Sequence, residues 1–243
     1  MNKKIYVVSG FSGVGKDTVL EKVAHIEKNV MQDRSKLWFS KSDTTRPTRN
    51  EADHYTFISK DEFLKRADAG YYLEMNTYET GELYGTPLMP IIDARGIVII
   101  QVDVNGMLQI KRDSRLKDIP IITIFIGSDA ETLLYRLQHR GDDEAEIRLR
   151  LGVAAEEAMH INEYDYMLVN EDADETSVKL WSILSGIPVT SDMFDESEFI
   201  NNVSGLLLAL DNLPTMVSIT SFLNSGVYRL FGTPFGIAKH PTC

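Results

Sequence analysis

The feature that most constrains the fold of this chain is a glycine-rich segment near its start. Residues 5–8 are apolar or aromatic and lead into Gly10, and from there to Lys16 the spacing is glycine, any four residues, glycine, lysine. This pattern predicts a buried strand, a tight loop and the start of a helix. Glycines let the backbone turn so tightly that several N–H groups point at one anion. The segment therefore predicts a binding site for nucleotide phosphates.

Lys16 supplies the positive charge of this loop. We expect its ammonium group to face the β- and γ-phosphates, with the positive end of the following helix dipole also holding them. Apolar side chains at helical spacing between residues 19 and 26 favour this interpretation over a structural glycine turn. The predicted ATP-binding residues of the loop are Ser12, Gly13, Val14, Gly15, Lys16, Asp17 and Thr18.

One loop position departs from the usual pattern. The residue after the lysine is ordinarily Ser or Thr, whose hydroxyl binds magnesium, and here it is Asp17, followed by Thr18. A carboxylate this close to a triphosphate is repelled by on the order of a few kcal/mol unless a cation lies between them. Because Mg²⁺ accepts carboxylate ligands, we predict that Asp17 contacts this ion directly or through water.

Composition and charge exclude several other classes of protein. The 243 residues, 43% of them hydrophobic, suit one globular domain with a small appendage. The formal net charge of −11 argues against a nucleic-acid partner, which requires a basic surface. No apolar run approaches the roughly 20 residues that cross a bilayer, and no signal peptide fits, so we expect no membrane partner and a cytoplasmic location. Cys243 is the only cysteine, which excludes an intrachain disulfide.

A second candidate anion site follows a short strand expected at residues 37–41. Arg46 and Arg49 lie three positions apart among small hydroxyl residues, ahead of Tyr55. Planar guanidinium groups bind phosphate oxygens through paired hydrogen bonds. The alternative is a solvated basic loop, but the phosphate loop earlier in the chain favours a second phosphate site.

At this segment the chain resembles the guanylate kinase family. The family's acceptor motif is Ser-x-Thr-Thr-Arg-x-x-Arg-x-Gly-Glu-x-x-Gly-x-x-Tyr-x-Phe, and the chain keeps Ser42, Thr44, Thr45, Arg46, Arg49, Glu51, Tyr55 and Phe57. Asn50 stands where the family has glycine, and residues are missing between Arg49 and Tyr55, so the acceptor loop is shorter than the family's. The resemblance extends over residues 3–186.

The resemblance also assigns later segments to the acceptor nucleotide. Residues 71–74 are similar to the family's Phe-Leu-Glu segment, and residues 81–86 to its Gly-Asn-Tyr-Tyr-Gly-Thr/Ser hairpin. Residues 96–103 are a strongly apolar run, expected to be a parallel strand, which ends at Asp103; Gln101 departs from an acidic residue of the family. The implied substrate-binding residues are Ser42, Arg46, Arg49, Tyr55, Glu74, Tyr84, Thr86 and Asp103.

Their implied roles divide between the acceptor phosphate and the guanine base. By resemblance, Tyr84 holds the phosphate together with the arginines, Glu74 accepts hydrogen bonds from the guanine edge, and Thr86 contacts the base. Asp103 would lie at the base or at the metal. The structural alternatives are ordinary turn residues at positions 84 and 86 and a surface carboxylate at position 74.

A charge-rich stretch after a helix predicted for residues 131–140 resembles the family's lid. Arg136, Arg140 and Arg150 fall on family arginines, while Gln138 does not, and the alternative is a solvated face. With Lys16 and Arg46, the three arginines are the predicted catalytic residues. Residues 163–170 match the family's Glu-Tyr-Asp-Tyr-x-x-Val-Asn, which implies that Asn170 lies near the adenine of ATP; the alternative is a turn-forming asparagine.

Strands alternating with helical patterns predict a three-layer α/β P-loop NTPase fold with a mostly parallel central sheet. We expect a guanylate kinase-like domain at residues 1–187, with its nucleoside monophosphate-binding part at about 42–90 and its lid at about 136–155. Residues 188–243 form a C-terminal extension of unknown role, with a helix expected at 195–210. The extension is too apolar to stay unpacked, so it covers either the kinase-like part or another subunit, which would make a homo-oligomer.

The predicted reaction is transfer of the γ-phosphoryl group of ATP, with Mg²⁺, to GMP or dGMP. Ribose 1,5-bisphosphate phosphokinases are an alternative, because they share Gly-Lys-Asp-Ser and a short Thr-Arg-Pro segment, but Ser42, Tyr55 and Glu74 argue for a base. A broad-specificity deoxynucleoside monophosphate kinase is a second alternative. The third, a non-catalytic guanylate-kinase-like binding domain, is disfavoured by the retained loop lysine and lid arginines.

Overall fold

The chain was analysed as a computed structural model, which describes residues 3–32, 36–48, 55–77 and 81–211. Its main sheet is parallel throughout, with the strand order β2-β7-β1-β8-β9. The strands are β1 (Lys4–Gly10), β2 (Leu37–Phe39), β7 (Ile97–Gln101), β8 (Ile121–Gly127) and β9 (Tyr166–Val169). Because β1 is central, residues 5–10 are all buried, as the apolar run before the glycine loop predicted. The strand expected at 37–41 ends at Phe39.

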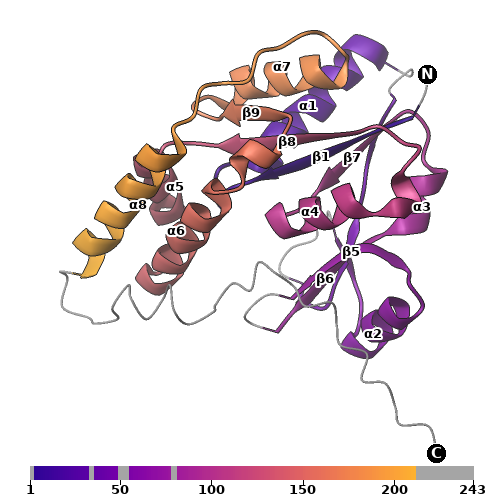
Figure 1. Cartoon of the computed structure of the whole chain (residues 1–243), viewed down its shortest axis with the longest axis horizontal. Coiled ribbons are helices and arrows are strands. Elements are labelled where there is room, and N and C mark those ends of the chain that lie inside the picture. Colours follow the sequence, from indigo (N-terminus) through magenta and orange to yellow (C-terminus); the bar gives the residue numbers. More distant parts are fainter. Residues whose placement is uncertain (1–2, 33–35, 49–54, 78–80, 212–243) are drawn as a thin grey trace, which may run out of the picture.

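Helices cover both faces of this sheet. Figure 1 shows α1 (Lys16–Met31) and α7 (Ala173–Leu184) on one side, and α3 (Leu88–Asp93) and α4 (Val104–Arg112) on the other. Two short 3₁₀ turns complete the connections, at Ser114–Leu116 and Ile161–Glu163. The predicted three-layer α/β fold with a parallel sheet is confirmed. Within the described ranges, no helix combines the length and apolarity that crossing a bilayer requires.

A second, smaller sheet faces the carboxyl ends of the main strands. Its order is β4-β3-β6-β5, built from β3 (Ser42–Thr44), β4 (Tyr55–Phe57), β5 (Tyr72–Thr77) and β6 (Leu83–Pro87). Helix α2 (Lys60–Asp68) covers it, with Phe63 stacked on Tyr72 at 4.5 Å between ring centroids. Asp43 is buried beneath α2, where its Oδ2 accepts hydrogen bonds from the Tyr72 hydroxyl and Arg66. These contacts hold β3 rigidly against the hairpin β5–β6.

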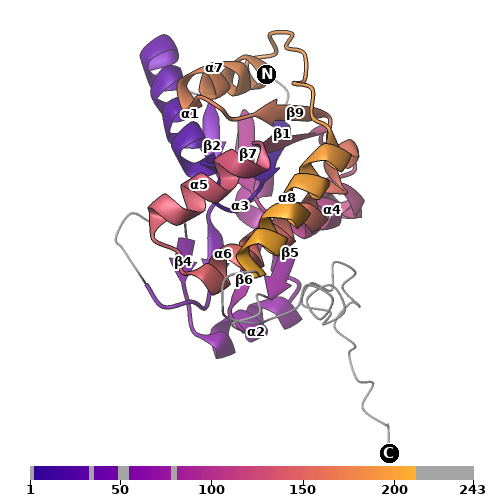
Figure 2. The ribbon, with the colours of Figure 1, turned by 90° about the vertical axis from the view of Figure 1, so that its left-hand side faces the viewer.

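The third part of the fold is helical. Helix α5 (Ala130–Arg140) is capped at its C-terminus by Gly141, which has φ 86°, and α6 (Glu144–Ala158) follows after a short turn. The predicted helix in the extension is α8 (Glu196–Asp211), which lies against α6 and α5 (Figure 2). Phe199 and Val203 of α8 are buried in the main core. This part of the extension therefore packs on its own chain, while residues 212–243 lie outside the described residues.

Candidate active site

A cleft with a cavity volume of about 700 Å³ lies where the main sheet, the small sheet and α6 meet. This size is typical of nucleotide and small-molecule sites. The predicted residues that line it are Ser12, Gly13, Gly15, Lys16, Asp17, Thr18, Ser42, Arg46, Tyr55, Glu74, Tyr84, Asp103, Arg140 and Arg150. Arg49 lies outside the described residues. The fold thus brings together segments that span most of the first 150 residues.

The glycine loop has the backbone geometry that its spacing predicted. Gly13 (φ 88°) and Gly15 (φ 96°) adopt left-handed conformations that side chains disfavour, and Gly15 caps α1. The Lys16 Nζ donates hydrogen bonds to the carbonyls of Gly10 and Phe11, at 2.6 and 2.9 Å. Burial lowers the pKa of Lys16, and the carboxylates of Glu157, Asp17 and Asp103 oppose that shift. The lysine is thereby held at the floor of the cleft.

Arg136 and Asn170 hold the loop through its backbone. The Val14 carbonyl accepts hydrogen bonds from Asn170 Nδ2 at 2.8 Å and from Arg136 Nη1 at 2.9 Å. A second nitrogen of Arg136 donates to the Glu171 carbonyl. Neither side chain is among the described residues that line the cleft. In this structure both residues therefore position the phosphate loop, and Val14 itself is buried.

The other two lid arginines face the cleft from α5 and α6. Arg150 donates a hydrogen bond to the Ser12 hydroxyl of the loop at 2.6 Å. Asp142 forms ion pairs with both arginines, at 3.1 Å from Arg150 Nε and closer to Arg140. A single carboxylate thus holds two guanidinium groups beside the phosphate loop.

A buried hydrogen-bond chain forms the far end of the cleft. The Ser42 and Thr86 hydroxyls are 3.0 Å apart, and Thr86 donates to Glu74 Oε1 at 2.6 Å. Glu74 is only 5% exposed, which rules out the surface carboxylate alternative, and Thr86 lies within strand β6, not in a turn. Burial raises the pKa of Glu74 to about 8, Thr86 opposes the shift and Asp103 reinforces it. This group can present either a proton or a negative charge to a ligand.

Aromatic rings surround the arginine of the predicted acceptor site. The Arg46 guanidinium lies 4.9 Å from the centroid of the Tyr55 ring and 5.6 Å from that of Phe57. Tyr55 in turn contacts Tyr84 edge-on, at 5.7 Å between centroids. The Arg46 Nε is buried and makes no hydrogen bond within the described part of the chain. An arginine with an unused donor in a cleft can bind an anion.

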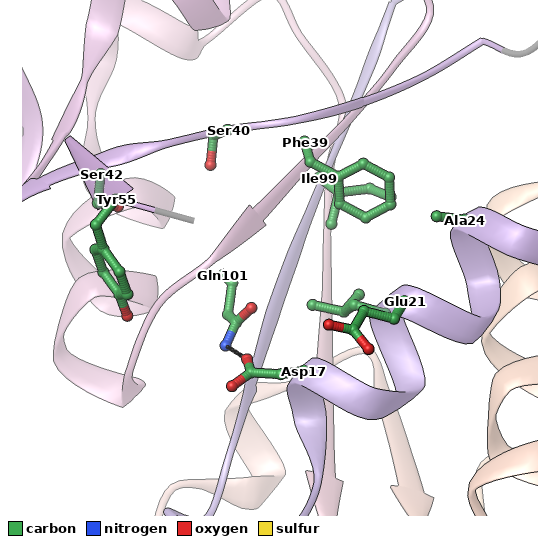
Figure 3. Close-up of a pocket in the computed structure, with 10 residues that line it drawn as sticks. Asp17, Glu21, Ala24, Phe39, Ser40, Ser42, Tyr55, Ile99 and Gln101 are labelled. Atoms are coloured by element: carbon green, nitrogen blue, oxygen red, sulfur yellow. Dashed lines mark hydrogen bonds between the residues drawn. The ribbon is translucent and has the colours of Figure 1, made fainter. Parts of the chain in front are cut away.

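Asp17 lines both the cleft and a side pocket of about 210 Å³ between α1, β2 and β7. Figure 3 shows Gln101 and Asp17 facing one another there, and Gln101 Nε2 donates to Asp17 Oδ1 at 2.7 Å. The described residues contain no group of three or more His, Cys, Asp or Glu side chains suited to a metal. Mg²⁺ needs no such group, because it keeps several waters and binds through one or two carboxylates plus substrate phosphates. A single exposed Asp17 at the phosphate loop fits that donor set.

Both carboxylate oxygens of Asp103 accept hydrogen bonds from other residues of the chain. It caps α4 by accepting a hydrogen bond from the Gly106 N–H at 2.7 Å, and its other oxygen accepts one from Asn76. Burial raises the pKa of Asp103, while these two hydrogen bonds lower it. The side chain lines the cleft between Lys16 and Glu74 and links the main sheet to β5.

Glu157 and Asn76 line the cleft but were not predicted. Glu157 is buried, its Oε2 has no hydrogen-bond partner in the described residues, and burial raises its pKa although the Lys16 charge opposes this. The sequence could have indicated that Glu157 lies at the site. Glu157 follows Arg150 by seven residues, so the two side chains lie on the same face of a helix. Asn76 had no comparable signal, since only the hairpin β5–β6 brings it to Asp103.

Comparisons with known proteins identify relatives of this chain. A family model described as guanylate kinase matches residues 2–186. A guanylate kinase of Bifidobacterium longum is 34% identical over 190 residues, covering 75% of this chain and 93% of that protein. One of Desulfotalea psychrophila is 35% identical over 193 residues, covering 76% and 90%. The crystal structure of guanylate kinase from Anaplasma phagocytophilum matches with a TM-score of 0.58 and 25% identity, covering 89% of this chain and 98% of that one.

Proposed function

The chain belongs to the guanylate kinase family, and on that premise we propose the parts its residues play in phosphorylating GMP with ATP. The reaction moves the γ-phosphoryl group of ATP to the phosphate of GMP or dGMP. One observation carries the assignment of roles: a single cleft joins the lysine of the phosphate loop to the buried chain of Ser42, Thr86 and Glu74. The first can hold a donor triphosphate and the second a base.

Catalysis of this reaction needs no nucleophilic side chain, because the acceptor phosphate oxygen is itself the nucleophile. The protein contributes alignment of the two substrates and stabilisation of charge in the transition state. The transition state is loose and spreads charge over the transferring phosphoryl group, where a well-placed arginine is worth roughly 10³ to 10⁵ in rate. We assign this role to Arg140 and Arg150, which face the cleft.

On the donor side, Lys16 and the amides of residues 12–18 hold the phosphates of ATP. Arg136 and Asn170 keep the loop in position by binding the Val14 carbonyl. Arg150 is bound to Ser12 in the free protein and exchanges that hydroxyl for a phosphate oxygen when ATP enters. Closure of residues 136–155 as a lid excludes water and limits ATP hydrolysis.

On the acceptor side, the small sheet within residues 42–90 binds GMP. Arg46 and Arg49 hold its phosphate with the hydroxyls of Tyr55 and Tyr84. Ser42, Glu74 and Thr86 recognise guanine, whose N1–H and amino group are donors that a carboxylate can accept. Asp103 supports this pocket from the main sheet, next to Glu74.

In this proposal Asp17 would hold Mg²⁺. When bound, the ion neutralises charge on the β- and γ-phosphates. The hydrogen bond from Gln101 fixes the orientation of the Asp17 carboxylate toward the cleft. Without a cation there, Asp17 would repel the triphosphate.

The proposal is tested by a coupled assay of ADP release with GMP, dGMP, other nucleoside monophosphates and ribose 1,5-bisphosphate as acceptors. We expect turnover with GMP and dGMP, none with Lys16→Ala, and for Glu74→Gln a loss confined to guanine nucleotides. Turnover with the sugar bisphosphate alone would overturn the assignment. Inactivity of the folded wild-type protein toward every acceptor would point to a binding domain.

A further inference from the structure

Helix α8 follows the residues that the family model matches. The family match ends at residue 186, and α8 begins at Glu196. Nevertheless α8 packs against α5 and α6, the two helices that carry the cleft arginines Arg140 and Arg150 (Figure 2). An element beyond the residues that the family model matches therefore lies against the donor side of the site.

The contact between this extension and the phosphate loop is made by Phe11. Phe11 follows Gly10 in the loop and is fully buried. Its ring stacks on that of Phe199 in α8, with 4.5 Å between centroids and an angle of 5° between planes. Phe194, just before α8, lies 6.2 Å away, and Phe125 of β8 contacts the loop ring edge-on at 5.0 Å. Phe11 is thus enclosed between the sheet and the extension.

Phe11 is also a structural part of the loop. Its carbonyl accepts the hydrogen bond from Lys16 Nζ at 2.9 Å and one from the Val14 N–H at 3.2 Å. A shift of the Phe11 backbone therefore displaces a carbonyl group that orients Lys16. Protein interiors are close-packed, so removal of the Phe199 ring leaves a space beside Phe11. That space is not filled unless Phe11 moves.

A second contact links α8 to the lid. Arg148 of α6 donates a hydrogen bond to the carbonyl of Leu210, near the end of α8. Arg148 precedes by two residues the arginine that binds Ser12 of the loop. One helix of the extension thus contacts the phosphate loop near its start and the lid near its end.

We propose that α8 positions the ATP-binding loop, and that Phe199 is a positioning residue that acts through Phe11 on Lys16. This inference rests on the proposed function, in that it takes the loop to bind ATP. It predicts that docking of α8 and binding of ATP reinforce each other, since a coupling free energy between two sites is reciprocal. The acceptor site, on the small sheet, is not expected to respond.

The first test compares Phe199→Ala with Val203→Ala in the full chain. Both remove a buried side chain from the same face of α8, but only Phe199 stacks on the loop. We expect Phe199→Ala to raise KM for ATP at least about 5-fold, the lower end of typical coupling, with KM for GMP within about twofold of the wild type. Val203→Ala should lower the melting temperature without changing KM for ATP. Phe199→Leu, which keeps most of the apolar volume, should recover part of the affinity.

The second test does not depend on activity. Hydrogen exchange of α8 amides is measured in the wild-type protein with and without ADP, and we expect slower exchange with ADP. An unchanged exchange rate at saturating ADP, or equal effects of Phe199→Ala and Val203→Ala on KM for ATP, would overturn the inference. Failure of the proposed function is distinguishable, because a protein that binds ADP but phosphorylates no acceptor would still show the exchange effect.

Discussion

We predict that Glu74 makes GMP binding sensitive to pH near neutrality. Burial raises its pKa to about 8, so the free protein at pH 7 holds this carboxyl mostly protonated. Guanine offers two adjacent donors, N1–H and its amino group, and binds well only to the carboxylate anion. On the proposed assignment of Glu74 to the guanine edge, binding of GMP removes the proton from Glu74.

The size of this effect follows from the pKa. Each pH unit below 8 costs about 1.4 kcal/mol of binding free energy, or about tenfold in affinity. The Kd for GMP should accordingly fall about tenfold between pH 7 and the plateau above pH 8. The phosphate of GMP itself ionises near pH 6, so the comparison is best made between pH 6.5 and 9.

The raised pKa of Glu74 favours GMP binding at high pH, but it favours the stability of the free protein at low pH. The folded-state pKa of Glu74 lies above the unfolded value of 4.5, so the folded protein binds this proton more tightly. Its contribution to stability is present below pH 4.5 and is lost as pH rises through 8. GMP, which binds the anion, should therefore stabilise the protein more at pH 8.5 than at pH 6.5.

Isothermal titration calorimetry with GMP in buffers of different protonation enthalpy measures the proton directly. At pH 7 we expect release of about 0.9 proton per GMP bound, since about a tenth of Glu74 is already ionised. Glu74→Gln should bind weakly, with no proton release and little pH dependence. Glu157→Gln, which removes another buried carboxyl on the donor side, should leave the release unchanged. Tight GMP binding at pH 7 with no proton released by the wild type would refute the reasoning.

Two further predictions concern other buried or paired carboxylates. Asp43→Ala removes the acceptor of the Tyr72 hydroxyl and of Arg66 Nη1, although Arg66 Nε keeps its bond to Glu62, and should lower the free energy of unfolding in urea by about 3 kcal/mol. Exposed Asp68→Ala should change it by less than about 0.5 kcal/mol, and equal effects would contradict this. Gln101→Ala removes the amide that orients Asp17, and should raise the Mg²⁺ concentration for half-maximal rate about tenfold; superimposable Mg²⁺ titrations of variant and wild type would contradict it.

Much of the donor site was predictable because its geometry is local. The loop between Gly10 and Lys16 follows from backbone conformations that only glycine adopts readily, and these depend on neighbouring residues alone. The buried strands and the helix at 195–210 follow from apolar periodicity for the same reason. Family resemblance brought in the acceptor residues, of which all but Arg49 lie in or against the cleft in the described structure.

Contacts between distant segments needed the tertiary structure. Asp17 and Gln101, two departures from the expected pattern, are 84 positions apart, yet they share a hydrogen bond. Arg136 was predicted to be a catalytic residue of the lid, and in the structure its guanidinium binds the loop backbone. The surroundings of Glu74, which set its pKa, also come from several segments.

The sequence therefore determined the phosphate loop, the α/β class of the fold and, through the family resemblance, the class of reaction. Only the tertiary structure decided which carboxylates are buried, which arginines face the cleft, and that Phe199 of the extension covers Phe11. The reason is physical: local conformation is set by side chains a few positions away, whereas burial and charge environment depend on how remote segments pack together.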